Sequence, residues 1–153
     1  MNKIKWAFLL IFIILMGCAT TRIDYGGNLG EYLTLVKLAR RTEQKVIIDY
    51  ECYSACVLWL SVGPELRVSK KALFGVHEAR KTSFRINGIL TPPISYEFAK
   101  RSEDMTKFYR SRIPECAVRL FDSEHAFDSG EITTFTGEEV LKACPEIKEY
   151  IAK

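Results

Sequence analysis

Short apolar segments alternate with longer amphipathic segments along this chain, and the alternation limits its possible folds. Val46–Tyr50 and Ala72–His77 are apolar runs of strand length, and the first is rich in β-branched residues. Leu29–Arg41 instead repeats apolar residues at helical spacing and ends in basic residues. Because strands that alternate with helices are typical of parallel sheets, the sequence predicts an α/β fold with a mostly parallel sheet flanked by helices.

Helix start and stop signals define most of the other elements. Ala55–Val62 is almost wholly apolar and is predicted to be a buried helix, with Cys52–Ser54 as the turn before it. Pro92–Arg112 and a shorter segment from Pro114 are also expected to be helices, and Thr136–Glu139 is a capping box for the last helix. Shorter expected features are strands at Thr20–Asp24, Arg67–Val68 and Ile132–Phe135, and a hairpin turn at Asn87–Gly88.

The first residues have the features of an export signal. Lys3 and Lys5 precede the apolar run Trp6–Met16, whose eleven residues are too few to span a membrane as a helix. The run ends in Leu15–Cys18, which resembles the lipobox of bacterial lipoproteins. That resemblance implies cleavage before Cys18 and acylation of this residue, so that lipid chains anchor the protein to a membrane. An ordinary signal peptide that happens to be followed by a cysteine is the alternative.

These features predict the organisation of the chain and its location. We expect residues 1–17 to be a lipoprotein signal peptide, residues 18–25 a lipidated tether and residues 26–153 one α/β domain. The protein would be anchored in a bacterial cell envelope, facing the periplasm or the exterior. Without Lys3 and Lys5, 20 of the 22 basic residues remain against 19 acidic residues. Since no basic excess is left, nucleic acid is not an expected partner.

The cysteines suggest a disulfide framework. There are five, and if Cys18 is lipidated, the other four allow two bridges in three pairings. We expect Cys116 to pair with Cys144, because the short helices that carry them should pack together, and an exported protein retains disulfides. Cys52 and Cys56 could be bridged or free. A zinc site at Cys52 and Cys56 lacks a second ligand pair, so no metal is expected.

A serine and a histidine stand where a catalytic pair could form. Ser54 lies at the predicted start of a helix, where free N–H groups could stabilise an oxyanion. His77 ends a predicted strand, and strand ends of open α/β sheets line ligand crevices. A neutral imidazole there could accept the proton of Ser54. Each residue also has a simpler explanation: Ser54 could be a helix cap and His77 a packing residue. His125 is expected to be a surface residue.

The order of these motifs resembles the proteolytic subunit of the Clp protease, and most closely the exported Clp-protease-like proteins of bacteria. The resemblance rests on Gly26-Gly27, the Cys-Tyr-Ser-Ala-Cys box at Cys52–Cys56 and the strand Leu73–His77, and it extends weakly to Thr133–Glu139. It implies a crotonase-like fold built of ββα repeats. It also implies Ser54 as nucleophile, His77 as general base, and the N–H groups of Gly27 and Ala55 as the oxyanion hole.

Three features depart from the family pattern. The family has an Asp as its third catalytic residue, but the alignment of motifs puts Thr133 there, with Asp128 five residues earlier. The region before Gly26 is short, and no ring-forming or ATPase-docking element is recognisable. The resulting prediction is a lipid-anchored, peptidase-like serine hydrolase that acts on peptide or ester bonds without a cofactor. The alternative is a non-catalytic binding or structural lipoprotein on the same fold.

Overall fold

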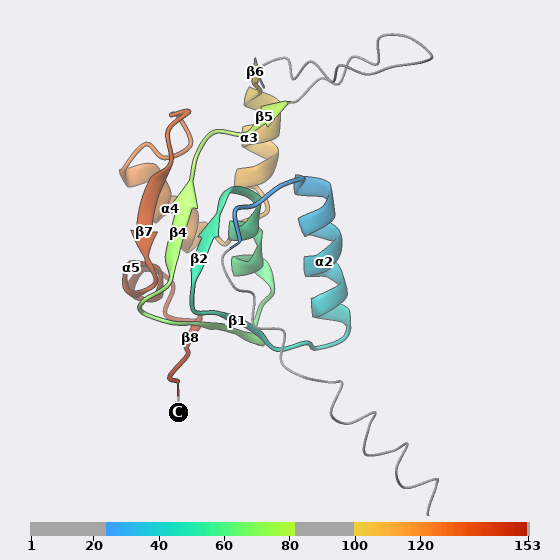
Figure 1. The fold of residues 1–153 in the computed structure, drawn as a ribbon, viewed down its shortest axis with the longest axis vertical. Helices are drawn as coiled ribbons and strands as arrows, with labels where there is room; N and C mark the ends of the chain where they lie inside the picture. Colours follow the sequence, from blue (N-terminus) through green and yellow to red (C-terminus); the bar gives the residue numbers. More distant parts are fainter. Residues whose placement is uncertain (1–23, 82–99, 153) are drawn as a thin grey trace, which may run out of the picture.

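The structure, a computed structural model, describes residues 24–81 and 100–152. The predicted leader, Cys18 and the hairpin turn at Asn87–Gly88 lie outside the described residues. The described part is an α/β fold, as the sequence predicts (Figure 1). Its helices are α2 (Leu29–Arg41), the 3-10 helix η1 (Ser54–Ser61), α3 (Glu103–Arg110), α4 (Glu115–Ser123) and α5 (Gly137–Ala143). Its strands are β1 (Val46–Ile48), β2 (Glu51–Tyr53), β3 (Leu66–Val68), β4 (Leu73–Val76), β5 (Arg80–Lys81), β6 (Lys100–Arg101), β7 (Thr133–Thr136) and β8 (Lys148–Glu149).

Two small sheets form the framework of the fold. The first has the order β1-β3-β8 and is entirely parallel. The second has the order β2-β4-β7, in which β2 and β4 are parallel and β7 runs antiparallel to β4. β5 and β6 form a separate antiparallel pair. The pairs β1–β3, β3–β8 and β2–β4 are therefore parallel, as expected for a mostly parallel sheet. The antiparallel pairing of β7 with β4 was not predicted from the sequence.

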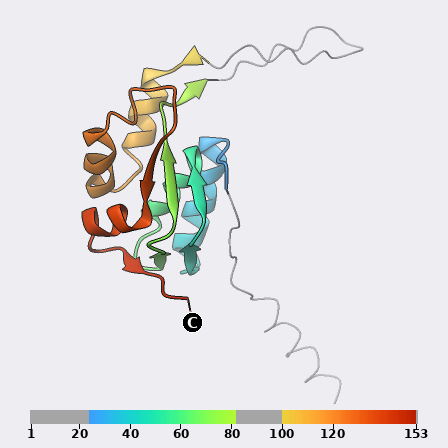
Figure 2. The ribbon, with the colours of Figure 1, turned by 60° about the vertical axis from the view of Figure 1, so that its left-hand side comes forward.

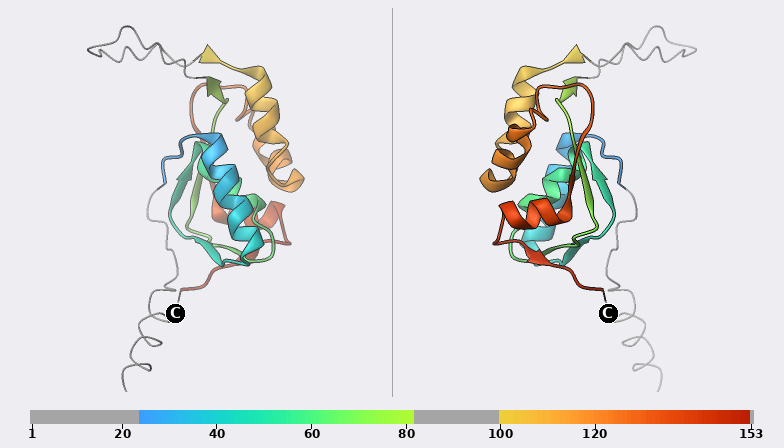
Figure 3. Two further views of the ribbon diagram at one scale, coloured as in Figure 1. Left: turned by 90° about the vertical axis from the view of Figure 1, so that its right-hand side faces the viewer. Right: turned by 90° about the vertical axis from the view of Figure 1, so that its left-hand side faces the viewer.

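The helices cover one face of the β2-β4-β7 sheet. Figures 2 and 3 show the three strands on one side of the molecule and the described helices on the other. Cys52, Phe74 and Phe135 lie side by side in register and are buried toward the helices. Because side chains alternate along a strand, Tyr53 and Gly75 belong to the opposite face. None of the described helices is long and apolar enough to cross a membrane.

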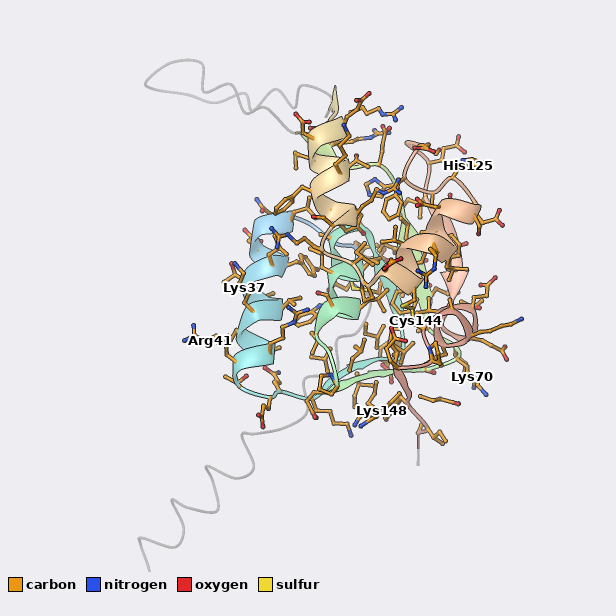
Figure 4. The ribbon with its side chains drawn as sticks, turned by 180° about the vertical axis from the view of Figure 1, so that it is seen from behind. Lys37, Arg41, Lys70, His125, Cys144 and Lys148 are labelled. Atoms are coloured by element: carbon orange, nitrogen blue, oxygen red, sulfur yellow. A yellow bond between two sulfur atoms is a disulfide. The ribbon has the colours of Figure 1, made fainter. Side chains whose placement is uncertain are left out.

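Helix α2 has the predicted bounds, but its buried face differs from the predicted one. Asn28 caps the helix, and Val36 and Ala39 are buried. Leu38, which was expected on the apolar face, is 54% exposed. Each helical residue turns the chain by about 100°, so Leu38 points away from the face that Val36 buries. Figure 4 shows Lys37 and Arg41 projecting outward from α2.

The segment predicted as a turn at Cys52–Ser54 is instead mostly strand. Glu51–Tyr53 form β2, because they pair with Leu73–Gly75 of β4 and because Asp24 bridges to Cys52 on the other side. The buried helix predicted at Ala55–Val62 is present, one residue earlier, as the 3-10 helix η1. The turn is thus confined to the junction between Tyr53 and Ser54.

Helix α3 begins later than the sequence predicts. The helix expected from Pro92 starts at Glu103, after the short strand β6, and residues 82–99 lie outside the described part. Ser102 is its N-cap, and the Ser102 Oγ accepts a hydrogen bond from the Met105 N–H at 3.4 Å. Tyr109 on this helix is buried, whereas Phe108, expected in the apolar stripe, is 41% exposed.

The predicted capping box of the last helix is confirmed. The Glu139 N–H donates to Thr136 Oγ1 at 3.3 Å, and the Thr136 N–H donates to Glu139 Oε2 at 2.7 Å. These bonds occupy donors that the helix itself leaves without partners. The hydrogen bonds from Thr136 also lower the pKa of the Glu139 carboxyl. α5 therefore starts at a fixed point directly after β7.

We expect Thr136→Ala to lower the free energy of unfolding by about 1 kcal/mol at pH 7. Because the pKa of Glu139 is lowered in the folded state, its contribution is present above the ordinary pKa of Glu and is lost as the pH falls through the lowered value. Thr136→Ala keeps the larger cause of the lowered pKa, the bond from the Thr136 N–H, and removes the smaller one, the bond from the Thr136 hydroxyl. The difference between variant and wild type in urea unfolding should therefore become smaller at pH 3 without disappearing. Thr34→Ala, on the exposed side of α2, is the control and should show no such pH dependence. An equal difference at both pH values would contradict this account.

Candidate active site

Ser54 and His77 follow neighbouring parallel strands at the same edge of one sheet. Ser54 comes directly after β2 and His77 directly after β4. Tyr53 lies opposite Gly75 in the register of these strands, so Ser54 and His77 are offset by one residue along the strand direction. The carboxyl edge of parallel strands is the usual place for ligand sites in α/β proteins.

The backbone of Ser54 has an unusual conformation. Its φ is +55°, whereas Tyr53 before it is extended with a φ of −107°. Left-handed φ values are uncommon for residues other than glycine, and they cluster where a sharp turn presents a functional side chain. A serine on such a strand-to-helix turn is typical of exposed nucleophiles. Among the described residues, none forms a hydrogen bond with Ser54 Oγ.

The carbonyl of Ser54 is held from helix α3. The Tyr109 hydroxyl donates to Ser54 O at 2.6 Å. Tyr109 is fully buried, and this burial raises the pKa of its hydroxyl far above the ordinary range. The hydroxyl therefore stays protonated and remains a donor at any physiological pH. No sequence pattern connects Tyr109 with Ser54, which is 55 positions away.

The Gly26-Gly27 turn lies against Ser54. A Cβ atom on Gly26 would lie 2.4 Å from Tyr53 O and 2.7 Å from Ser54 Cβ, and the φ of Gly26 is +79°. The Gly26 N–H donates to Asp24 Oδ1 at 3.0 Å, and the Tyr32 hydroxyl donates to the same oxygen. The Gly26-Gly27 turn was expected from the sequence with Gly27 as an oxyanion donor, whereas the contact of Gly26 with Ser54 and the anchoring role of Asp24 were not.

The two amides predicted as oxyanion donors are not engaged within the described residues. Gly27 follows the residue that packs on Ser54, and no described group accepts its N–H. Ala55 is the second residue of η1, and its N–H lies 3.0 Å from the position of a Cβ on Gly26. The first N–H groups of a helix have no partner within it. Both amides thus belong to the same small region around Ser54.

We expect Gly26→Ala to lower the free energy of unfolding by about 2–4 kcal/mol, since the added Cβ meets backbone atoms and the positive φ is strained. Gly63→Ala is the matched control. Gly63 also has a positive φ, of +100°, but a Cβ there would meet no atom within 4 Å. The control should therefore cost only about 1–2 kcal/mol. Urea unfolding of both variants measures the difference, and equal losses would show that the contact with Ser54 is unimportant.

The ring of His77 is fixed through Nδ1. His77 Nδ1 lies 2.5 Å from Glu78 O. Because a carbonyl oxygen can only accept, Nδ1 carries the proton in the neutral ring and Nε2 keeps its lone pair. This is the tautomer that a general base needs when it accepts a proton at Nε2. The described residues include no hydrogen bond between Ser54 Oγ and His77.

The segment after His77 is anchored by several interactions that the sequence did not reveal. The Glu78 N–H donates to Ser129 O at 2.9 Å, and the Ala79 N–H donates to Thr106 Oγ1 at 3.0 Å. The carboxylate of Glu78 is buried and forms ion pairs with Arg80 at 3.5 Å and Arg101 at 3.2 Å. The polar contacts of Glu78 thus tie the end of β4 to the β5–β6 pair.

Neither candidate for a third catalytic residue contacts His77 within the described residues. Asp128 is exposed and lies beside His125, with its Oδ2 3.5 Å from His125 Nδ1. Figure 4 shows His125 at the periphery of the molecule, and it is a surface residue as expected. Thr133 pairs with Val76, so its side chain shares the face of Val76, on the opposite side of the strand from the next residue, His77. Within the described residues, the partner of Nδ1 is the carbonyl of Glu78 and not Asp128 or Thr133, the two residues considered for a third catalytic position.

The described residues contain two disulfides. Cys52 in β2 is bonded to Cys56 in η1, so the bridge flanks Ser54 on both sides. Cys116 in α4 is bonded to Cys144 after α5, which is the pairing expected from the sequence. The Sγ atoms of Cys116 and Cys144 and a carboxylate oxygen of Glu146 lie within 4.8 Å of one another. Sulfur atoms in a disulfide cannot act as thiolate ligands, so this cluster is not a thiolate metal site.

Within the described residues, the carboxyl edge of β2 and β4 therefore carries a hydroxyl with no described partner, an imidazole whose Nε2 keeps its lone pair, and two amides at a turn. Such a set can carry out acyl transfer, in which a nucleophile attacks a carbonyl while a base takes its proton. No protein-family model matches this chain, and no curated protein is significantly similar to it in sequence.

Proposed function

We propose that this protein is a lipid-anchored serine hydrolase, peptidase-like in its chemistry, with Ser54 as nucleophile and His77 as general base. The observation that carries the proposal is the left-handed turn at Ser54, directly after a strand whose parallel neighbour is followed directly by His77. A left-handed serine at a strand-to-helix junction is strained, and such strain is common at functional sites. A serine that only capped a helix would normally have an extended backbone, so capping alone does not explain this conformation.

The proposed reaction is acyl transfer through a covalent intermediate. Ser54 Oγ attacks the carbonyl carbon of a peptide or ester while His77 Nε2 accepts the hydroxyl proton. The N–H groups of Gly27 and Ala55 stabilise the resulting oxyanion. His77 then gives its proton to the leaving group as the bond to the carbonyl carbon breaks. Water, deprotonated by His77, hydrolyses the acyl-enzyme and regenerates Ser54.

The fold that this proposal uses is a crotonase-like arrangement of the Clp-protease-like type. It is supported by the parallel strands that end at Ser54 and His77 and by the glycine turn packed on Ser54. The carbonyl of Glu78 would fix the tautomer of His77 but could not stabilise the imidazolium as a carboxylate does. We therefore expect a slower hydrolase than one with a complete triad.

A fluorophosphonate probe tests the proposed function directly. The full chain, extracted in detergent from a bacterial host, should become covalently modified, and peptide mapping should place the phosphonyl group on Ser54. Ser54→Ala should abolish the modification, whereas Ser61→Ala, at a buried serine in the same helix whose Oγ donates to Leu58 O at 2.7 Å, should not. A wild-type protein that does not react, or that reacts elsewhere, would leave a non-catalytic binding lipoprotein as the better explanation.

We expect mature protein extracted from membranes to begin at a lipidated Cys18. Both described disulfides join cysteines other than Cys18, and disulfides persist in exported proteins. Intact-mass measurement should show the loss of residues 1–17 and the addition of acyl chains. Cys18→Ser should leave the precursor unprocessed. A mass equal to that of unmodified Met1–Lys153 would contradict this prediction.

A further inference from the structure

The Cys52–Cys56 disulfide encloses Ser54 in a very short loop. Cys52 lies in β2 and Cys56 in η1, and their Cα atoms are 5.3 Å apart at a sequence separation of 4. Both residues are buried, with exposed fractions of 1% and 3%. The centre of the loop is Ser54, whose φ is +55°. The bridge and the left-handed residue are therefore parts of one local structure.

The bridge excludes the simplest alternative conformation of this segment. In a continued strand, two residues separated by four positions would be about 13 Å apart, which a disulfide cannot span. The chain must therefore leave the extended conformation between Cys52 and Cys56. Tyr53 stays extended because it pairs in β2, with φ −107° and ψ 151°. The turn out of the strand consequently begins at Ser54, the first residue of η1.

Two other contacts hold Ser54 but leave its hydroxyl without a described partner. Gly26 packs against the Ser54 Cβ, and the Tyr109 hydroxyl binds the Ser54 carbonyl at 2.6 Å. Neither contact prevents β2 from extending past Ser54 in the way that a covalent bridge does. The bridge is thus the covalent constraint on the backbone that presents Ser54 Oγ.

A disulfide that closes so short a loop stabilises the folded state less than one that closes a long loop. The entropy that a disulfide removes from the unfolded chain grows with the number of residues it encloses. Cys116–Cys144 has a sequence separation of 28, against 4 for Cys52–Cys56. The short bridge is therefore expected to stabilise the fold less than the long one.

We infer that the Cys52–Cys56 disulfide is a positioning element that holds Ser54 in its left-handed conformation. This inference rests on the proposed function for its consequence in catalysis. It assigns no chemical step to the sulfur atoms. The two cysteines fix where Ser54 Oγ lies relative to His77, and the long disulfide has no such role.

The experiment compares two variants that each remove one bridge, Cys52→Ala/Cys56→Ala and Cys116→Ala/Cys144→Ala, in the detergent-extracted full chain. Fluorophosphonate modification is followed over a range of probe concentrations. Removal of the short bridge should lower the maximal modification rate by about 10- to 100-fold, with little change in the probe concentration that gives half the maximal rate. Removal of the long bridge should lower Tm more but leave the maximal rate within about twofold. If Cys52→Ala/Cys56→Ala folds poorly, Cys52→Val/Cys56→Ala replaces it in this comparison, because a β-branched residue at position 52 favours the strand β2.

A crystal structure of Cys52→Ala/Cys56→Ala tests directly whether the bridge holds Ser54 in its left-handed conformation, whether or not the protein is a hydrolase. The expected result is a Ser54 φ that has left the left-handed region. A variant that keeps both a positive φ at Ser54 and the wild-type modification rate would overturn the inference while the proposed function stands. If the wild-type chain does not react with the probe, the proposed function fails, and the φ of Ser54 in the variant still tests the positioning role.

Discussion

Replacing His77 by Gln should lower the rate at which a fluorophosphonate modifies Ser54 by about 10²- to 10⁴-fold, the usual contribution of a general base. Without an imidazole at the end of β4, nothing accepts the proton of Ser54 as the bond to phosphorus forms. Gln keeps much of the size and polarity of His, so the loss should not come from unfolding. The measurement is the pseudo-first-order rate of modification, with circular dichroism as a check on folding.

The chain offers matched controls for this prediction. His125→Gln removes the other histidine, which is exposed and contacts Asp128 rather than any residue of the site. Asp128→Asn and Thr133→Val remove the two residues considered for a third catalytic position. All three variants should react at close to the wild-type rate. A His77→Gln variant that reacts normally would mean that Ser54 uses another base or that its reactivity is incidental.

Removing the Cys116–Cys144 bridge should cost about 3–4 kcal/mol of stability in the chain-entropy account, because the bridge closes a long loop. Cys144 is fully buried and Cys116 is partly buried, and the bridge joins α4 to the end of α5. We expect Tm of the Cys116→Ala/Cys144→Ala variant to fall by about 10–15 °C in a domain of this size. Differential scanning calorimetry of the purified protein measures the shift.

The short bridge provides the comparison. By the same relation, Cys52→Ala/Cys56→Ala should cost only about 2 kcal/mol, since its loop is much shorter. Equal losses in the two variants would mean that loop entropy does not govern these disulfides. Peptide mapping under non-reducing conditions should recover both pairs, and exchange between the pairs would contradict the structure.

Elements with strong local signals were predictable from the sequence. The bounds of α2 follow from apolar spacing and from its basic end, and the start of α5 follows from the Thr136–Glu139 capping box. The apolar run after Ser54 was correctly predicted to be a buried helix, although it forms a 3-10 helix. In each case the residues that decide the structure are close together in the chain.

Features that depend on distant partners were not predictable in this way. β2 contains the polar residue Glu51 and carries no strand pattern of its own, and it is a strand because Asp24 and β4 pair with it on its two sides. β8 is two exposed residues long and is defined only by pairing with β3. The late start of α3 likewise depends on β6, which exists only through its pairing with β5.

The candidate site also contains some features that local sequence patterns predict and others that depend on distant residues. Ser54 could be selected from the sequence because it stands at the start of an apolar helical segment, and His77 because it ends an apolar segment of strand length. The hydrogen bond from Tyr109 to Ser54 and the buried Glu78 with its two arginines connect residues from separate elements. The contact of Gly26 with Ser54 depends on the backbone conformation of both residues. No local pattern in the sequence encodes these contacts.

The parallel pairing of Asp24 with β2 has a consequence for the direction from which substrates arrive. At Asp24 the chain runs alongside β2, toward the edge where Ser54 and His77 lie. A tether that precedes Asp24 therefore joins the domain from the amino ends of these strands. Six residues from Cys18 to Asp24 reach at most about 20 Å when fully extended. If Cys18 is lipidated as we propose, the leaflet lies on the side of the amino ends of β2 and β4, and the Ser54 edge faces away from it. The proposed hydrolase would then favour water-borne polypeptides over esters buried among lipid chains.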